Sequence, residues 1–274
     1  MTLRAAWCEL TERLGLADDW WSAVAAYYGV SRRDAIRLGT RAPGRRPTLP
    51  GSPTCAPVSG HIWEELWAAK PRTTPDEIAS FYREVGSWCV FRQLVRHRGR
   101  GFVDVSRRLP KGGTLIEYGC GIAPVTWWLS QRRPNFNVAL VDIQSEPLEF
   151  ALVRLHGVVK KLGQLCAALH VYRYRVGSVL PHMPAHDVAV VLEVLEHVPS
   201  PILTMRSILA ALKPGGWLLE DFRSHDGDGS PADLESAAME RPAMYHLLRR
   251  ECRLVSGEVP ETPGGGSRRW WVKR

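Results

Sequence analysis

The sequence predicts an α/β protein in which helices cover a mostly parallel sheet, with a helical segment in front of it. After Pro110, short apolar runs alternate with helical stretches, as they do in a parallel sheet wrapped by helices. The chain has 274 residues, 45% of them hydrophobic, enough for one large core and a smaller helical appendage. Near the C-terminus, two apolar runs flank a turn rich in proline and glycine, which indicates an antiparallel pair.

Seven strands are expected from these apolar runs. In chain order they are Thr114–Tyr118, Val138–Asp142, Leu169–Val176, Asp187–Leu192, Trp217–Phe222, Arg253–Val259 and Ser267–Val272. Helices are expected from Pro124, over Ser145–Lys161, from Ser200 to Leu212 and from Ser230 to Arg250. In open α/β sheets the active site lies at the carboxyl ends of the strands, so the loops after the strands are the place to look for chemistry.

The segment before residue 111 has a helical pattern. Trp7–Tyr28 and Gly60–Ala69 have helix-compatible spacing, and residues 41–60, rich in Pro, Gly, Ser and Thr, indicate a loop or linker between them. Thr74, Pro75 and Glu77 are typical of a capped helix start. Apolar residues then recur near a period of 3.6 as far as position 95, which predicts one helix with one buried face.

Composition narrows the class of protein. The net charge of +8 and the pI near 9.4 suit an anionic partner, but the arginines occur as scattered pairs typical of solvated faces, so a nucleic-acid partner is not expected. The six cysteines have no ligand or disulfide spacing, so we expect no metal site and a reducing environment. No stretch has the pattern of a secretion signal or a membrane span, which favours a cytoplasmic protein without membrane contact. We allow for a homodimer.

The first expected strand runs into a glycine-containing loop, Glu117-Tyr-Gly119-Cys120-Gly121, with Pro124 at the start of the next helix. Glycines permit backbone conformations and a close ligand approach that side chains obstruct. Alone, this short pattern also fits a structural turn. The second strand ends in Asp142, at the distance where such folds place an acid against ribose hydroxyls. Its alternative is a cap for the helix from Ser145.

Together these motifs resemble those of class I S-adenosylmethionine-dependent methyltransferases. The fourth-strand segment Asp187–Pro199 and the Leu212–Trp217 run before the fifth strand add two more motifs in the same order. The resemblance implies a Rossmann-like seven-stranded sheet with S-adenosylmethionine as cofactor. It also implies that residues 111–274 form the cofactor-binding domain and residues 1–110 a helical lid that recognises the acceptor.

The resemblance assigns cofactor-binding positions along the whole domain. They are Tyr82, Trp88, Glu117, Gly119, Cys120, Gly121, Asp142, Ile143, Ser178, Val179 and Glu193. Glu117 is expected at the methionine end, Asp142 and Ile143 at ribose and adenine, and the helix bearing Tyr82 and Trp88 over the cofactor, where core packing is the alternative. Two departures stand out: Ala123 replaces a frequent third glycine, and Ser178 stands in a region that often supplies an aspartate for adenine.

The run Glu193-Val-Leu-Glu196-His197 at the end of the fourth strand carries the expected catalytic residues. Its two carboxylates and its imidazole fit either a hard-cation site or a general base beside the transferred methyl group. It is similar to a signature of metal-assisted ubiquinone-pathway O-methyltransferases and small-RNA 2′-O-methyltransferases. The same run also shapes the cofactor pocket of metal-independent relatives. We assign Glu193, Glu196 and His197 as catalytic candidates and no metal ligand.

The sequence thus predicts a methyltransferase that acts on an oxygen or nitrogen atom of a small molecule, with a specialised metabolite as acceptor. Three alternatives stay open. The same pocket could support intramolecular alkyl transfer from S-adenosylmethionine, which releases methylthioadenosine. The charge and the Glu193–His197 run could serve RNA 2′-O-methylation. The fold could also belong to a non-catalytic partner subunit.

Overall fold

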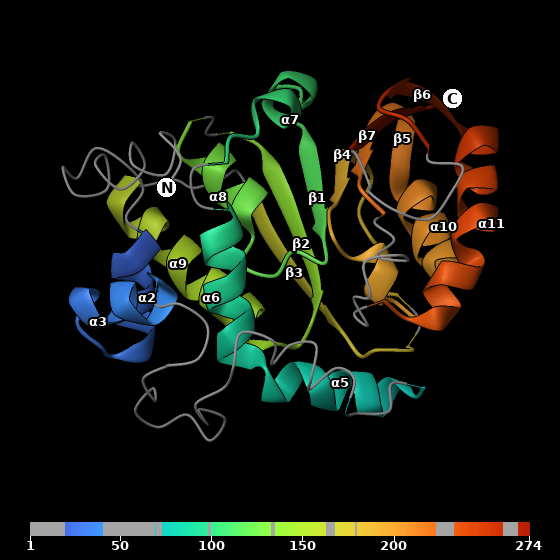
Figure 1. Ribbon diagram of the computed structural model, residues 1–274. Coiled ribbons are helices and arrows are strands. Elements are labelled where there is room, and N and C mark those ends of the chain that lie inside the picture. Colours follow the sequence, from blue (N-terminus) through green and yellow to red (C-terminus); the bar gives the residue numbers. More distant parts are fainter. Residues whose placement is uncertain are drawn as a thin grey trace.

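The computed structural model describes residues 20–40, 69, 73–97, 100–132, 135–162, 168–178, 180–222, 233–259 and 268–274. Helices cover both faces of one seven-stranded sheet (Figure 1). The predicted 41–60 linker, residues 60–68 of the predicted helix at 60–69 and residues 7–19 of the predicted Trp7–Tyr28 helix lie outside this described part. None of the helices within it is long and apolar enough to cross a membrane.

The sheet has the strand order β3-β2-β1-β4-β5-β7-β6. Its strands are β1 (Thr114–Tyr118), β2 (Asn137–Ile143), β3 (Ala168–Tyr174), β4 (His186–Val191), β5 (Leu212–Glu220), β6 (Cys252–Ser256) and β7 (Arg269–Lys273). The first five strands pair in parallel, and β7 runs antiparallel between β5 and β6. The predicted fold class is confirmed. The order turns at β1 and β4, which in open α/β sheets is where ligands bind.

Two helical layers enclose the sheet. The helices are α2 (Trp20–Tyr28), α3 (Arg32–Thr40), α5 (Pro75–Glu84), α6 (Gly86–His97), α7 (Val103–Arg108), α8 (Pro124–Ser130), α9 (Glu146–Leu162), α10 (Pro201–Ala211) and α11 (Glu235–Glu251). Figure 1 shows α2, α6, α8 and α9 on one side, α10 and α11 on the other, and α5 across the end of the sheet. Successive residues of a strand point to opposite faces of the sheet. Leu115 packs in the core on the side of α2, α6, α8 and α9, and Ile116 in the core on the side of α10 and α11.

The start of α5 is confirmed, but the single long helix expected after it is wrong. Thr74 caps α5 through Glu77, and the two form a reciprocal capping box. The helix ends at Glu84, and α6 begins at Gly86. A Cβ atom at Gly86 would lie 2.9 Å from the Cβ atom of Glu146 on α9. The close approach of α6 and α9 therefore requires glycine there, and glycine is a poor helix former.

Several other boundaries differ from the expectation, and β6, for example, ends at Ser256 and not at Val259. Strand β3 ends at Tyr174, two residues early. Strand β5 begins at Leu212, so the Leu212–Trp217 run expected before the strand lies within it, and Gly215 in this run has a φ of +73°. Helix α11 begins at Glu235 because Leu234 is extended and its N–H donates to the Glu196 carbonyl at 2.9 Å. This hydrogen bond holds the start of α11 against the segment that follows β4.

Candidate cofactor and acceptor site

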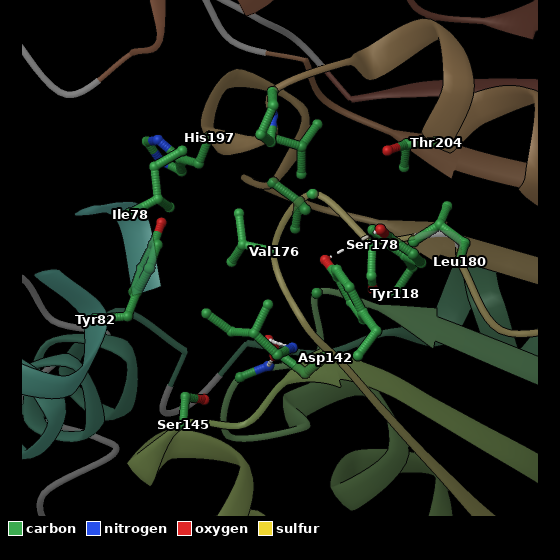
Figure 2. Close-up of a pocket in the computed structure, with 18 of the residues that line it drawn as sticks. Ile78, Tyr82, Tyr118, Asp142, Ser145, Val176, Ser178, Leu180, His197 and Thr204 are labelled. Carbon is green, nitrogen blue, oxygen red and sulfur yellow. Dashed lines mark hydrogen bonds between the residues drawn. The ribbon is translucent and has the colours of Figure 1, made fainter. Parts of the chain in front are cut away.

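A cavity of about 580 Å³ lies beyond the carboxyl ends of β1, β2 and β4. Its walls come from α5, α6, the glycine loop, the ends of β2 and β3, the segment after β4, and α10. Figure 2 shows Tyr82, Asp142 and His197 around one part of it and Tyr118, Leu180 and Thr204 around another. The predicted residues that line it are Tyr82, Gly119, Gly121, Asp142, Ile143, Ser178, Glu193 and His197. The volume is in the range of small-molecule sites.

The glycine loop has the conformation that its sequence requires. Gly119 and Gly121 have φ values of +61° and +49°. A Cβ atom on Gly121 would meet the amide nitrogen of Gln93 at 2.7 Å, and one on Gly119 would meet a Val194 methyl at the same distance. Ala123 stands where the family often has a third glycine. Its backbone is also left-handed, with φ +50°, which costs about 1–2 kcal/mol for a residue with a side chain. These glycines are needed because neighbouring side chains close around the loop.

Asp142 fixes this loop from the end of β2. One carboxylate oxygen accepts a hydrogen bond from the Gly121 N–H at 2.6 Å, and the other accepts from the Ile143 N–H at 2.7 Å. Burial raises the pKa of Asp142 to about 6, although these two bonds oppose the shift. Its oxygens thus bond to the loop and the strand end, whereas a cap for α9 would bond to the first turn of that helix.

Glu117, at the expected methionine end, holds the helix that follows the loop. Its carboxylate accepts hydrogen bonds from the N–H groups of Val125 and Thr126 and from the Thr126 hydroxyl, at 2.7–3.1 Å. Glu117 therefore caps α8 in place of Ala123, whose side chain has no acceptor. Burial raises the pKa of Glu117 to about 7. Its side chain lines a second cavity of about 80 Å³, shared with Cys120 and Glu193.

Glu193 is held in place from two directions. Its backbone is left-handed, with φ +59°, and its N–H donates to Asp221 at 2.6 Å. Its carboxylate forms an ion pair with Arg96 of α6 at 2.5 Å, with 15% and 29% of the two side chains exposed. Glu193 lines both the large and the small cavity. This combination of backbone strain and fixed charge is typical of functional positions.

His197 and Glu196 have different surroundings, although they are adjacent. His197 lines the large cavity with 19% of its side chain exposed. The Glu196 side chain is 1% exposed and does not line that cavity, and its Oε1 lies 3.9 Å from the His197 Nε2. Burial raises the pKa of Glu196 well above its usual value. Its carboxyl group is thus buried next to His197 and does not border the cavity, and the catalytic role predicted for Glu196 stays a prediction.

The remaining predicted residues fall into two groups. Tyr82 lines the cavity and packs edge-on against Phe81, with ring centroids 5.4 Å apart. Ser178 is exposed, and its hydroxyl donates to the Arg175 carbonyl at 2.6 Å. The side chain of Trp88 and residue Val179 lie outside the described part of the chain. Among the residues that are described, no group of three His, Cys, Asp or Glu side chains is arranged to hold a metal ion.

Polar residues of α6 that were not predicted from the sequence also face the glycine loop. Gln93 accepts a hydrogen bond from the Ile122 N–H at 2.9 Å and lines both cavities. His97, one turn on, lines the small cavity, and burial lowers its pKa to about 3, so its imidazole stays neutral. Their spacing of four, with Arg96 between, was the available signal, because it places polar groups on one side of an amphipathic helix.

Several known proteins that are similar in sequence to this chain are methyltransferases. A family model described as a methyltransferase domain matches residues 92–255. A ubiquinone biosynthesis O-methyltransferase from Nitrosospira multiformis is 31% identical over 122 residues, which cover 43% of this chain and 46% of that protein. The enzyme of the same name from Idiomarina loihiensis is 28% identical over 151 residues, covering 52% and 58%. The chain thus matches about half the length of these relatives.

Solved structures of similar fold include two methyltransferases. The N-methyltransferase NodS from Bradyrhizobium japonicum, in complex with S-adenosylhomocysteine, has a TM-score of 0.43 and 14% identity, covering 66% of this chain and 84% of that one. A SAM-dependent methyltransferase from Methanosarcina mazei has a TM-score of 0.41 and 16% identity, covering 62% and 95%.

Proposed function

The chain belongs to the family of class I S-adenosylmethionine-dependent methyltransferases, and from this membership we propose that it methylates a hydroxyl group of a small organic molecule. One observation carries the proposal: a single cavity joins the glycine loop and Asp142 to His197. The O-methyltransferase names of the curated relatives support oxygen as the acceptor atom. The alternative acceptor atom is a nitrogen. As expected from the sequence, the acceptor molecule that we propose is a specialised metabolite.

The residues of this cavity fit the cofactor. Asp142 presents a half-buried carboxylate, which suits the two hydroxyls of a ribose. Glu193 lines the cavity with a carboxylate that suits the ammonium group of the amino-acid end, and this carboxylate is held by Arg96 of α6. The bound cofactor supplies a methyl group on a positively charged sulfur, which is already activated for transfer. The protein therefore has to align the acceptor, exclude water and take up a proton.

We assign to His197 the role of the base that takes up the proton of the acceptor hydroxyl. A neutral imidazole ring has one nitrogen with a free lone pair, which can accept the proton of an acceptor hydroxyl as the oxygen takes the methyl group. Glu196 is a positioning residue in this scheme, since its carboxyl group lies behind the ring at 3.9 Å. The α5 residues Ile78 and Tyr82 wall the same cavity and exclude water from it. This matches the lid role proposed for residues 1–110.

The test is a product analysis with defined acceptors. The protein is incubated with S-adenosylmethionine alone, and then with phenols, catechols or primary amines, and the products are followed by mass spectrometry. We expect S-adenosylhomocysteine only when an acceptor is present, with hydroxyl acceptors preferred. His197→Asn should slow turnover of a hydroxyl acceptor by about 100-fold or more and leave S-adenosylhomocysteine binding intact. His246→Asn, an exposed histidine on α11, is the matched control.

Two results would overturn the proposal. Methylthioadenosine released without any acceptor would indicate intramolecular alkyl transfer. No turnover with any acceptor, together with no binding of S-adenosylhomocysteine, would favour the non-catalytic subunit. An equal rate for His197→Asn and wild type would leave methyl transfer standing but remove His197 as the base.

A further inference from the structure

A second groove lies along the edge strand β6. This strand is the last in the sheet order, so one of its long edges pairs with no other strand in the described part of the chain. A groove of about 670 Å³ follows β6 from the end of α11 to the turn at Gly257. Figure 1 shows β6 far from α5, which walls the cofactor cavity. The groove is therefore separate from the proposed methyl-transfer site.

Three arginines give this groove a positive charge. Arg249, Arg253 and Arg274 line it and are exposed, and Glu258 is the one acidic residue among its described lining residues. None of the three arginines forms an ion pair with another described residue, whereas the adjacent Arg250 pairs with Glu251 at 2.8 Å. Their charges are therefore available to a partner.

The strand register brings two of these arginines together on one side of the sheet. The Cα atom of Arg253 is in register with that of Val272 on β7, which makes Arg253 and Arg274 diagonal neighbours. In an antiparallel pair, diagonal neighbours point to the same side and lie about 7–8 Å apart. The Arg274 N–H donates to the Glu251 carbonyl at 3.0 Å, which holds this residue beside the end of α11. Like charges in this arrangement repel each other, and a carboxylate near both relieves the repulsion.

The other side of β6 is apolar. Successive strand residues point to opposite sides, so Leu254 points away from Arg253. Leu254 is in register with Trp271, and both line the groove together with Val259. The edge of β6 thus offers positive charge on one side and apolar contact on the other.

We propose that β6 binds an extended acidic peptide segment of a partner protein, which adds to the sheet as an eighth strand. Strand addition uses main-chain hydrogen bonds for affinity and alternate side chains for specificity. A segment in which acidic and apolar residues alternate places its carboxylates toward Arg253 and Arg274 and its apolar side chains toward Leu254. The net charge of +8 also attracts an acidic partner over a longer range.

A second copy of this chain suits the edge less well. Pairing of two β6 strands about a twofold axis brings the arginines of both copies together, and like charges across a strand pair are destabilising. Charged residues on an edge strand can also serve only to prevent pairing. That alternative predicts that no peptide binds, so binding of a short peptide separates the two.

Fluorescence anisotropy with labelled peptides tests the proposal. The probe is a short peptide in which glutamate and valine alternate, titrated with the full chain at low salt. We expect it to bind, and to bind more weakly as salt is added. The same peptide with lysine in place of glutamate should not bind. Two further peptides are N-methylated at the glutamate amides or at the valine amides. At least one of them should bind about tenfold more weakly, because alternate amides of an added strand bond to the edge.

A matched pair of variants locates the binding. Arg253→Glu should weaken the glutamate–valine peptide by about threefold to thirtyfold, because it turns an attraction into a repulsion. Arg33→Glu makes the same change of charge at an exposed position of α3 and should match wild type. Both variants should bind S-adenosylhomocysteine as wild type does, which shows that they are folded.

Several results would overturn the proposal. No binding of the glutamate–valine peptide at low salt would leave the arginines as protection of the edge. Full binding of both N-methylated peptides, or equal losses in Arg253→Glu and Arg33→Glu, would indicate attraction by charge without strand pairing. A wild-type dimer in sedimentation that the peptide dissociates would assign the edge to a second copy. An RNA oligonucleotide that Arg253→Glu weakens more than the peptide would assign the arginines to phosphate groups.

Discussion

Protonation of Asp142 should control cofactor binding between pH 5 and pH 7. Its carboxylate accepts two backbone hydrogen bonds, and burial raises its pKa to about 6. The proposed contact with the ribose needs the ionised form, because a carboxylate accepts two hydroxyl hydrogen bonds and a carboxylic acid has to donate one itself. As the pH falls through 6, the binding-competent fraction of the protein therefore decreases.

The size of the effect follows from the pKa. With a pKa of about 6, roughly one tenth of Asp142 is ionised at pH 5 and roughly nine tenths at pH 7. The apparent Kd is the intrinsic Kd divided by the competent fraction, so it should fall by about tenfold from pH 5 to pH 7 and then level off. Calorimetric titration of S-adenosylhomocysteine at half-unit pH intervals measures this directly.

A matched variant shows whether Asp142 causes the slope. Asp142→Asn keeps one carbonyl oxygen for the Gly121 N–H and cannot ionise, so it should bind weakly and without this pH dependence. Equal wild-type affinities at pH 5 and pH 7 would refute the reasoning. A slope that persists in Asp142→Asn would assign it to another group, of which Glu117 is the first candidate because burial raises its pKa to about 7.

Three further predictions concern the scaffold of the site. Gly121→Ala should weaken S-adenosylhomocysteine binding by about 5–30-fold, since the left-handed backbone costs about 1–2 kcal/mol; Gly215→Ala, with φ +73° and open space around it, is the control and should not change binding. Glu220→Gln should lower the free energy of unfolding by about 3–5 kcal/mol in denaturant titration, because it breaks a fully buried ion pair with Arg269. Thr74→Ala should destabilise the start of α5 by about 0.5–2 kcal/mol, seen as faster amide exchange in that helix.

Local sequence signals were sufficient for most of the fold. The bounds of β1, Thr114–Tyr118, were predicted without error, because an apolar run between two glycine-containing turns specifies a buried strand. The capping box at Thr74 was equally local. The break between α5 and α6 was missed because the apolar period continues through Gly86. Its cause is the contact with Glu146, 60 residues away, which no pattern around Gly86 reveals.

In the site, too, some residues could be predicted from local sequence and others depend on contacts between distant segments. That Asp142 and Gly121 line one cavity could be expected from the sequence, because a strand end and a glycine turn are visible in it. Tyr174 lines the cavity but was not predicted to do so. Its place there depends on the strand register that brings it beside Ile143 and on the stacking with Tyr118, neither of which is visible in the local sequence. The sequence also could not show which of the adjacent residues Glu196 and His197 borders the cavity, and the structure places only His197 there.

The two carboxylates at the ends of β1 and β2 explain how so short a glycine motif can hold its shape. Glu117 binds the first amides of α8, after the loop, and Asp142 binds the Gly121 amide within it. The loop is thus fixed at two points by buried acids before any ligand arrives, and Ala123 can keep a left-handed backbone without a glycine's freedom. Because Asp142 serves both the loop and the proposed ribose contact, its removal should disturb the two together. Glu117→Gln should instead loosen α8 while leaving Asp142 and its pH dependence in place.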